Sequence, residues 1–79
     1  MEILEKVFGS AARVKVMRLF LLNKTKTFTS KDIATRSRIS PDSTRKELKV
    51  LDAVEFVKKR ASGYVFNPNF KYTSELEGL

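Results

Sequence analysis

The sequence contains no cysteine, no histidine and no tryptophan among its 79 residues. Without cysteine it has no disulfide bond and no thiolate nucleophile, and without cysteine or histidine it has no zinc site of the usual kind. Histidine is also the commonest general base near neutral pH. The carboxylates do not cluster, and the three glycines, Gly9, Gly63 and Gly78, form no phosphate-binding loop. We therefore expect a protein that is not an enzyme and that uses no metal or other cofactor.

Long apolar segments are missing as well. The longest strongly apolar run is residues 19–22, far short of the roughly 20 apolar residues that a membrane-spanning helix needs. Residues 1–5 contain no basic segment leading into an apolar stretch, so we expect no signal peptide. These absences predict a cytoplasmic protein with no membrane association.

Basic residues are in excess over acidic ones. The 16 Lys and Arg against 9 Asp and Glu give a formal net charge of +7 and a pI of about 10.0. All 16 basic residues and only five of the acids lie within residues 6–71, so this range carries +11. A basic body favours a polyanionic partner, most often nucleic acid. The competing interpretation is that the charge only solvates a small surface.

The length suits one small domain and not two independent cores. With 42% hydrophobic and 32% charged residues, the composition is that of a folded chain. We expect a single domain over residues 1–79 with its core at about 8–68. Residues 69–79 are expected to form a tail or the start of a further helix, as in a fragment of a longer protein.

A helix is predicted over residues 10–22, with Ser10 as its N-cap. Arg13 falls within the apolar face of this helix, where we expect its stem to pack and its guanidinium to pair with an internal acid. Lys15 and Arg18 fall on the opposite face. A polar break at 23–26 follows, and the alternating residues 27–29 predict one short strand. The apolar face of the helix at 10–22 consists of Val14, Val16, Met17, Phe20 and Leu21.

Two further helices are predicted between residues 30 and 53. The first spans about 30–37, begins at Thr29 or Ser30, and turns Ile33 and Ala34 inward. The next begins at Ser40-Pro41, because Ser is a favoured N-cap and Pro is favoured at the first helical position. Ile39 is expected to plug the turn between them. In the later helix, Thr44, Leu48 and Leu51 form the buried stripe, and Asp42, Arg45, Lys46 and Lys49 form the opposite face.

A β-hairpin is predicted at about residues 56–67. Residues 56–61 and 64–67 are rich in β-branched and aromatic side chains, and Ser62-Gly63 between them favours a tight turn. Pro68 ends the hairpin. We expect Phe28, Tyr64 and Phe66 to belong to the sheet core rather than to stack on bases.

The predicted order is helix, short strand, helix, tight turn, helix and hairpin, which is the plan of a helix-turn-helix with a wing. Residues 8–20, 28–34, 39–51 and 56–67 resemble winged helix-turn-helix transcriptional regulators of the bacterial and archaeal ArsR/MarR-like type. The resemblance covers about residues 8–68. It implies an α+β fold, mainly α, in which a three-helix bundle carries a short strand and a C-terminal β-hairpin wing.

Two features depart from this resemblance. Those regulators usually place a left-handed glycine before the wing, where this sequence has Val54-Glu55. Either Glu55 accepts a strain of about 1–2 kcal/mol, or the helix ends differently. The Cys and His ligands of the metal-sensing members are absent, so the resemblance implies no metal sensing.

We therefore expect sequence-specific binding to double-stranded DNA by a transcriptional regulator, associated with the nucleoid if the source is prokaryotic. The helix at about 40–53 would enter the major groove, and the hairpin at about 56–67 would contact the backbone. Solvated surface charge is the alternative for each residue assigned here. The expected base contacts are Asp42, Ser43, Arg45 and Lys46, and the expected phosphate contacts are Lys31, Arg36, Arg38, Lys49, Lys58, Lys59 and Arg60.

Other functions remain open from the sequence. Winged helices also act as protein–protein interaction modules within larger assemblies, and an exposed apolar patch would favour this function. This apolar patch would consist of Phe70, Tyr72, Leu76 and Leu79, and the same residues with Ile3, Leu4 and Val7 could instead form the seam of a homodimer. RNA binding has less support from the sequence, because proteins that read single-stranded RNA expose aromatic side chains for stacking, and we assign the aromatic residues to the core.

Overall fold

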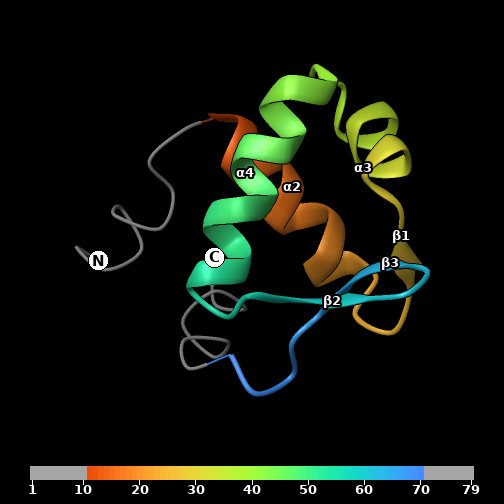
Figure 1. Cartoon of the computed structure of the whole chain (residues 1–79), viewed down its shortest axis with the longest axis vertical. Coiled ribbons are helices and arrows are strands. Elements are labelled where there is room, and N and C mark those ends of the chain that lie inside the picture. Colours follow the sequence, from red (N-terminus) through yellow and green to blue (C-terminus); the bar gives the residue numbers. More distant parts are fainter. Residues whose placement is uncertain (1–10, 71–79) are drawn as a thin grey trace.

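A computed structural model of the chain describes residues 11–70. This part contains three helices and one three-stranded antiparallel sheet (Figure 1). The fold is therefore α+β and mostly helical, as predicted, and it is compatible with a winged helix. The elements are α2 (Ala11–Leu22), β1 (Thr27–Phe28), α3 (Ser30–Ser37), α4 (Pro41–Ala53), β2 (Val57–Arg60) and β3 (Gly63–Phe66).

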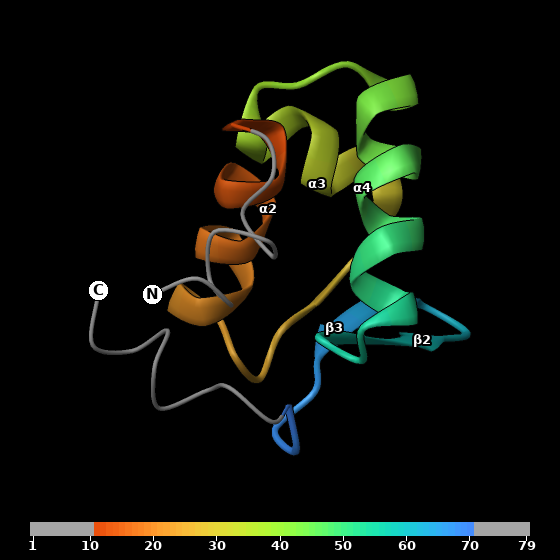
Figure 2. The ribbon, with the colours of Figure 1, turned by 90° about the vertical axis from the view of Figure 1, so that its left-hand side faces the viewer.

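The three helices pack against one another, and the sheet lies at one end of them. Helices α2 and α4 both direct their C-terminal ends toward the sheet (Figure 2). Strand β3 lies between β1 and β2 and pairs with both. Because β1 directly precedes α3 and β2 follows α4, the sheet ties the two ends of the α3–α4 segment together.

Helices α3 and α4 begin where predicted, and of the two caps considered for α3 the structure has Thr29. The Thr29 hydroxyl accepts a hydrogen bond from the Asp32 amide at 3.1 Å, and the Ser40 hydroxyl accepts one from the Ser43 amide at 3.1 Å. Pro41 is the first residue of α4, where its missing N–H leaves no helical bond unmade. The N-terminal ends of α3 and α4 were therefore predictable from local capping chemistry.

Each of these helices is followed by a left-handed residue that is not glycine, Arg38 directly after α3 and Glu55 one residue after the α4 cap at Val54. Arg38 after α3 has φ 57°, and Glu55 after α4 has φ 64°. The following amides, of Ile39 and Phe56, donate back across the helix ends to the carbonyls of Ala34 and Leu51, at 3.1 and 2.9 Å. The question left open by the sequence is thus settled, because Glu55 adopts the strained conformation.

The hairpin turn differs from the prediction by one residue. The turn consists of Ala61 and Ser62, whereas Gly63 already belongs to β3 and pairs with Arg60. Gly63 has φ 139°, and a Cβ atom there would lie 2.3 Å from the carbonyl oxygen of Phe28. The glycine is needed because β3 approaches β1 closely, which the local turn pattern could not indicate.

Aromatic side chains form much of the core. The ring of Phe56 makes edge-on contacts with Phe66 and Phe70, at centroid distances of 5.2 and 5.0 Å, and Phe20 contacts Phe28 at 5.7 Å. The predicted burial of Phe28 and Phe66 is confirmed, and the partly buried Tyr64 packs against this core.

Phe70 corrects two expectations. Its side chain is only 5% exposed, so the core extends beyond residue 68 and Phe70 does not belong to an exposed apolar patch. The other residues expected in that patch or in a dimer seam lie outside the described residues, as does Ser10. They are Ile3, Leu4, Val7, Tyr72, Leu76 and Leu79.

Replacing Glu55 by glycine should stabilise the fold. Relief of the left-handed strain, about 1–2 kcal/mol, exceeds the entropic cost of glycine, about 0.5–1 kcal/mol. We expect the free energy of unfolding to rise by about 0.5–1 kcal/mol in urea titrations. The matched control is Ala53→Gly in the last turn of α4, which should lower it by about 0.5–1 kcal/mol. A loss of stability in Glu55→Gly would contradict the strain.

Candidate nucleic-acid interface

Helix α4 has one buried face and one exposed face. Thr44, Leu48 and Leu51 are buried, as predicted, and the Thr44 hydroxyl donates to the Ser40 carbonyl at 2.9 Å. A buried polar group is thus satisfied within the helix. The side chains predicted to lie on the opposite face are all exposed. They are Asp42, Arg45, Lys46 and Lys49.

A largely buried ion pair fixes the orientation of α4 against α2. The Arg13 Nε atom donates to the Glu47 Oε1 atom at 2.8 Å, and the two side chains are only 17% and 7% exposed. The sequence predicted that Arg13 pairs with an internal acid but did not identify Glu47. The spacing contained the signal, because Glu47 lies three residues after Thr44 and four before Leu51, on the same face.

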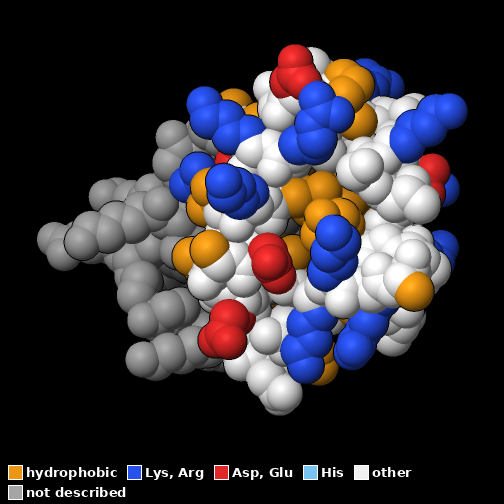
Figure 3. Space-filling view, viewed as in Figure 1, with side chains coloured by type: hydrophobic (Ala, Val, Ile, Leu, Met, Phe, Trp, Pro, Cys, Tyr) orange, Lys and Arg blue, Asp and Glu red, His pale blue; other side chains and the backbone are white. Residues whose placement is uncertain are grey.

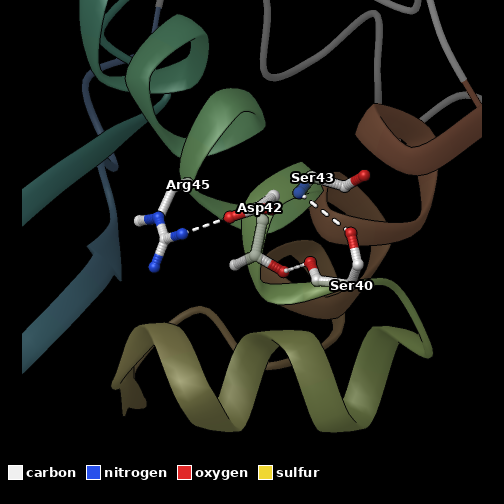
Figure 4. A network of polar contacts seen from close by, with 5 residues as sticks. Ser40, Asp42, Ser43 and Arg45 are labelled. Atoms are coloured by element: carbon white, nitrogen blue, oxygen red, sulfur yellow. Dashed lines mark hydrogen bonds and ion pairs between the residues drawn. The ribbon is translucent and has the colours of Figure 1, made fainter.

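Three of the expected base contacts, Asp42, Ser43 and Arg45, lie in the first turns of α4, next to the cap residue Ser40 (Figure 4). Asp42 and Arg45 form an ion pair on the exposed surface, where the Arg45 side chain keeps 69% of its exposure. Ser43 is half-buried, and its amide completes the cap on Ser40. An exposed pair of this kind contributes little to stability, so Arg45 can exchange Asp42 for a ligand at small cost.

The cations of α3 and of its C-terminal turn are exposed. Lys31, Arg36 and Arg38, all expected phosphate contacts, have exposed side chains. The Arg36 guanidinium lies 5.5 Å from the centroid of the Phe28 ring, a cation–π distance that holds it beside β1. Arg38 is presented from the left-handed turn between α3 and α4.

The hairpin provides the remaining expected phosphate contacts. Lys59 and Arg60 are exposed, whereas Lys58 is half-buried. All three lie on β2, which is an edge strand of the sheet. Lysines on an edge strand also prevent edge-to-edge aggregation, so part of this charge has a structural use.

Together these elements form one cationic face. In Figure 3, Lys and Arg side chains gather over α4, α3 and the hairpin and outnumber the acidic ones on the same side. Most of the expected contact residues are exposed, Ser43 and Lys58 being half-buried, and the fold brings their three elements to a common side.

A cleft between α3 and the start of α4 was not predicted. Its volume is about 510 Å³, and we call it the α3–α4 cleft. No local sequence pattern indicated this cleft, because its wall residues come together only when α3 and α4 pack against each other. The wall residues are Ser30, Lys31, Ala34, Thr35, Ile39, Pro41 and Arg45.

Two features were not found in residues 11–70. No group of three or more acidic side chains in this part comes together where a metal ion could be held. None of its helices has the length and apolarity needed to cross a bilayer. Comparisons with protein-family models, with curated proteins and with solved structures gave no match to the chain.

Removing the Arg13 guanidinium should destabilise the fold strongly. Arg13→Met deprives the buried Glu47 carboxylate of this partner. We expect a loss of about 3 kcal/mol in urea unfolding, the lower end for a buried pair, because Arg13 is partly exposed. The double variant Arg13→Met/Glu47→Leu should lose less than the sum of the single losses, with a coupling of about 1–3 kcal/mol. Arg18→Met, exposed on the same helix, should change stability by under about 0.5 kcal/mol. Additive single effects would contradict the role of the pair.

Proposed function

We propose that the chain binds double-stranded DNA sequence-specifically, as the reading domain of a transcriptional regulator with a winged helix-turn-helix fold. The observation that carries this proposal is the division of α4. Its inward face is held by the core and by the Arg13–Glu47 ion pair, while Arg45, Lys46 and Lys49 are exposed on the other face. A major groove about 12 Å wide admits such a helix.

The N-terminal half of α4 would read base edges. Arg45 and Lys46 suit the O6 and N7 acceptors of guanine, and Asp42 suits the N4 amino group of cytosine. In the free chain Arg45 pairs with Asp42 on the exposed surface (Figure 4), and base contacts would replace this weak pair at small cost. Ser43 adds a hydroxyl that accepts or donates to either kind of base.

The remaining exposed cations would hold the phosphate backbone and set the register of the protein on DNA. The proposed wing is the β2–β3 hairpin, and α3 would brace across the backbone as the first helix of the motif. Their contribution is electrostatic and independent of sequence. The residues given this role are Lys31, Arg36, Arg38, Lys49, Lys58, Lys59 and Arg60.

Apolar surface gives less support to a protein–protein interaction module. Among the described residues, the large hydrophobic side chains that are exposed are Leu22 and Val54, at the C-terminal ends of different helices. Phe70, which was expected to contribute to a patch, is buried. The cationic face therefore carries more of the argument than any apolar face of the described residues.

Selection of bound sequences from a random duplex pool tests the proposal most broadly. A strong consensus is the expected result, and a palindromic consensus would add that two copies bind together. Recovery of unrelated sequences would reject sequence-specific recognition. Absence of binding at low salt would reject DNA binding altogether.

The affinity for DNA should depend steeply on salt. If about five phosphates are neutralised, a plot of log K against log salt concentration should have a slope near −4.5. Fluorescence anisotropy with a labelled duplex measures this slope. A slope near zero would contradict the proposal.

Two charge-removing variants should differ in kind. Arg45→Ala should reduce the preference for the selected sequence, because one good base contact is worth roughly 1–3 kcal/mol of discrimination. Lys59→Ala should weaken binding to all duplexes alike. Lys15→Ala, on the outer face of α2, is the control and should change neither affinity nor preference. The reverse pattern in competition binding would contradict the assigned roles.

A further inference from the structure

The α3–α4 cleft combines apolar walls with cations. Ala34 is buried and Ile39 is half-buried, so these two line its inner part. Lys31 and Arg45 are exposed at its edge, together with Pro41 and Thr35. Such a surface is complementary to a ligand that has a small apolar group beside negative charge.

Duplex DNA has one feature of this kind in the major groove. The 5-methyl group of thymine is the apolar feature of its base edge, and it lies next to the phosphates of its own strand. Alanine side chains and threonine methyl groups are among the usual contacts of this methyl group. Both residue types line the cleft, in Ala34 and Thr35.

We propose that the α3–α4 cleft receives the 5-methyl group of a thymine in the bound duplex. This inference rests on the proposed DNA-binding function and adds an apolar component to its specificity. Lys31 contacts a phosphate beside that thymine, and Arg45 reads the neighbouring base pair. The volume of about 510 Å³ exceeds the needs of one methyl group and leaves room for the base edge and its sugar.

The test replaces each thymine of the selected duplex by uracil, one position at a time, and measures Kd with the full chain at fixed salt. This change removes the methyl group and keeps every hydrogen-bonding group. We expect one thymine in each bound site at which the change weakens binding about fourfold, the value for burying one methyl-sized group. If the duplex binds but no uracil changes Kd, the cleft proposal is overturned while DNA binding stands.

A variant with altered cleft walls tests whether the thymine at which uracil weakens binding contacts this cleft. In Thr35→Ser/Pro41→Ala, which alters two exposed side chains, the uracil effect should fall from about fourfold to below about twofold. The control Thr25→Ser changes an exposed threonine outside the cleft and should leave the effect at about fourfold. An unchanged uracil effect in the cleft variant would overturn the proposal.

A second measurement needs no variant. A duplex with 5-iodouracil at the sensitive position is irradiated with the wild-type chain, and the cross-linked tryptic peptide is identified. A cross-link to peptide 27–31, 32–36 or 39–45, which together contain the cleft walls, is expected. A cross-link to the hairpin would overturn the proposal. An acidic, leucine-containing peptide that binds the wild type but not the cleft variant, with no uracil effect, would assign the cleft to a protein partner instead.

Discussion

The ion pair between Arg13 on α2 and Glu47 on α4 joins two residues that lie 34 positions apart in the chain. Because Glu47 is nearly buried, orientations of α4 that bring this carboxylate to Arg13 on α2 are favoured. A rotation that exposed Glu47 would break the pair and turn the cationic face toward the core. Burying a charge is costly unless it is paired. The pair therefore makes one orientation of α4 much more favourable than others, beyond what Leu48 and Leu51 achieve by packing.

The aromatic core fixes the position of the hairpin, as the ion pair fixes the orientation of α4. Phe56 follows the left-handed Glu55 directly and contacts both Phe66 and Phe70 edge-on. The Asn67 side chain also donates to the Glu55 carbonyl at 2.8 Å, so the sharp exit from α4 is held from two sides. The strain at Glu55 persists because burial of the following phenylalanine requires it. These contacts set the distance between the exposed face of α4 and the basic strand β2, on which joint DNA contact would depend.

Local chemistry made much of this structure predictable. The cap at Ser40 follows from neighbouring residues, and the burial of Thr44 follows from its helical spacing to Leu48 and Leu51. The extent of α3 was also predicted, although its cap was narrowed only to Thr29 or Ser30. The features that depend on distant parts of the chain were not predictable in this way. The partner of Arg13, the need for Gly63 beside Phe28, and the burial of Phe70 are set by tertiary packing.

The candidate site divides along the same line. Exposure of the cations on α4 was predictable from helical periodicity. That these cations share one side with those of α3 and the hairpin, and that a cleft lies beside Arg45, depends on the assembled fold.

The most direct test of the proposed DNA interface is a titration of the ¹⁵N-labelled chain with the selected duplex, in which the amide chemical shifts are measured. We predict the largest shift changes at residues 42–49, smaller ones at 58–60, and none at Lys15 and Arg18. Largest changes on the outer face of α2, with α4 unaffected, would contradict the account.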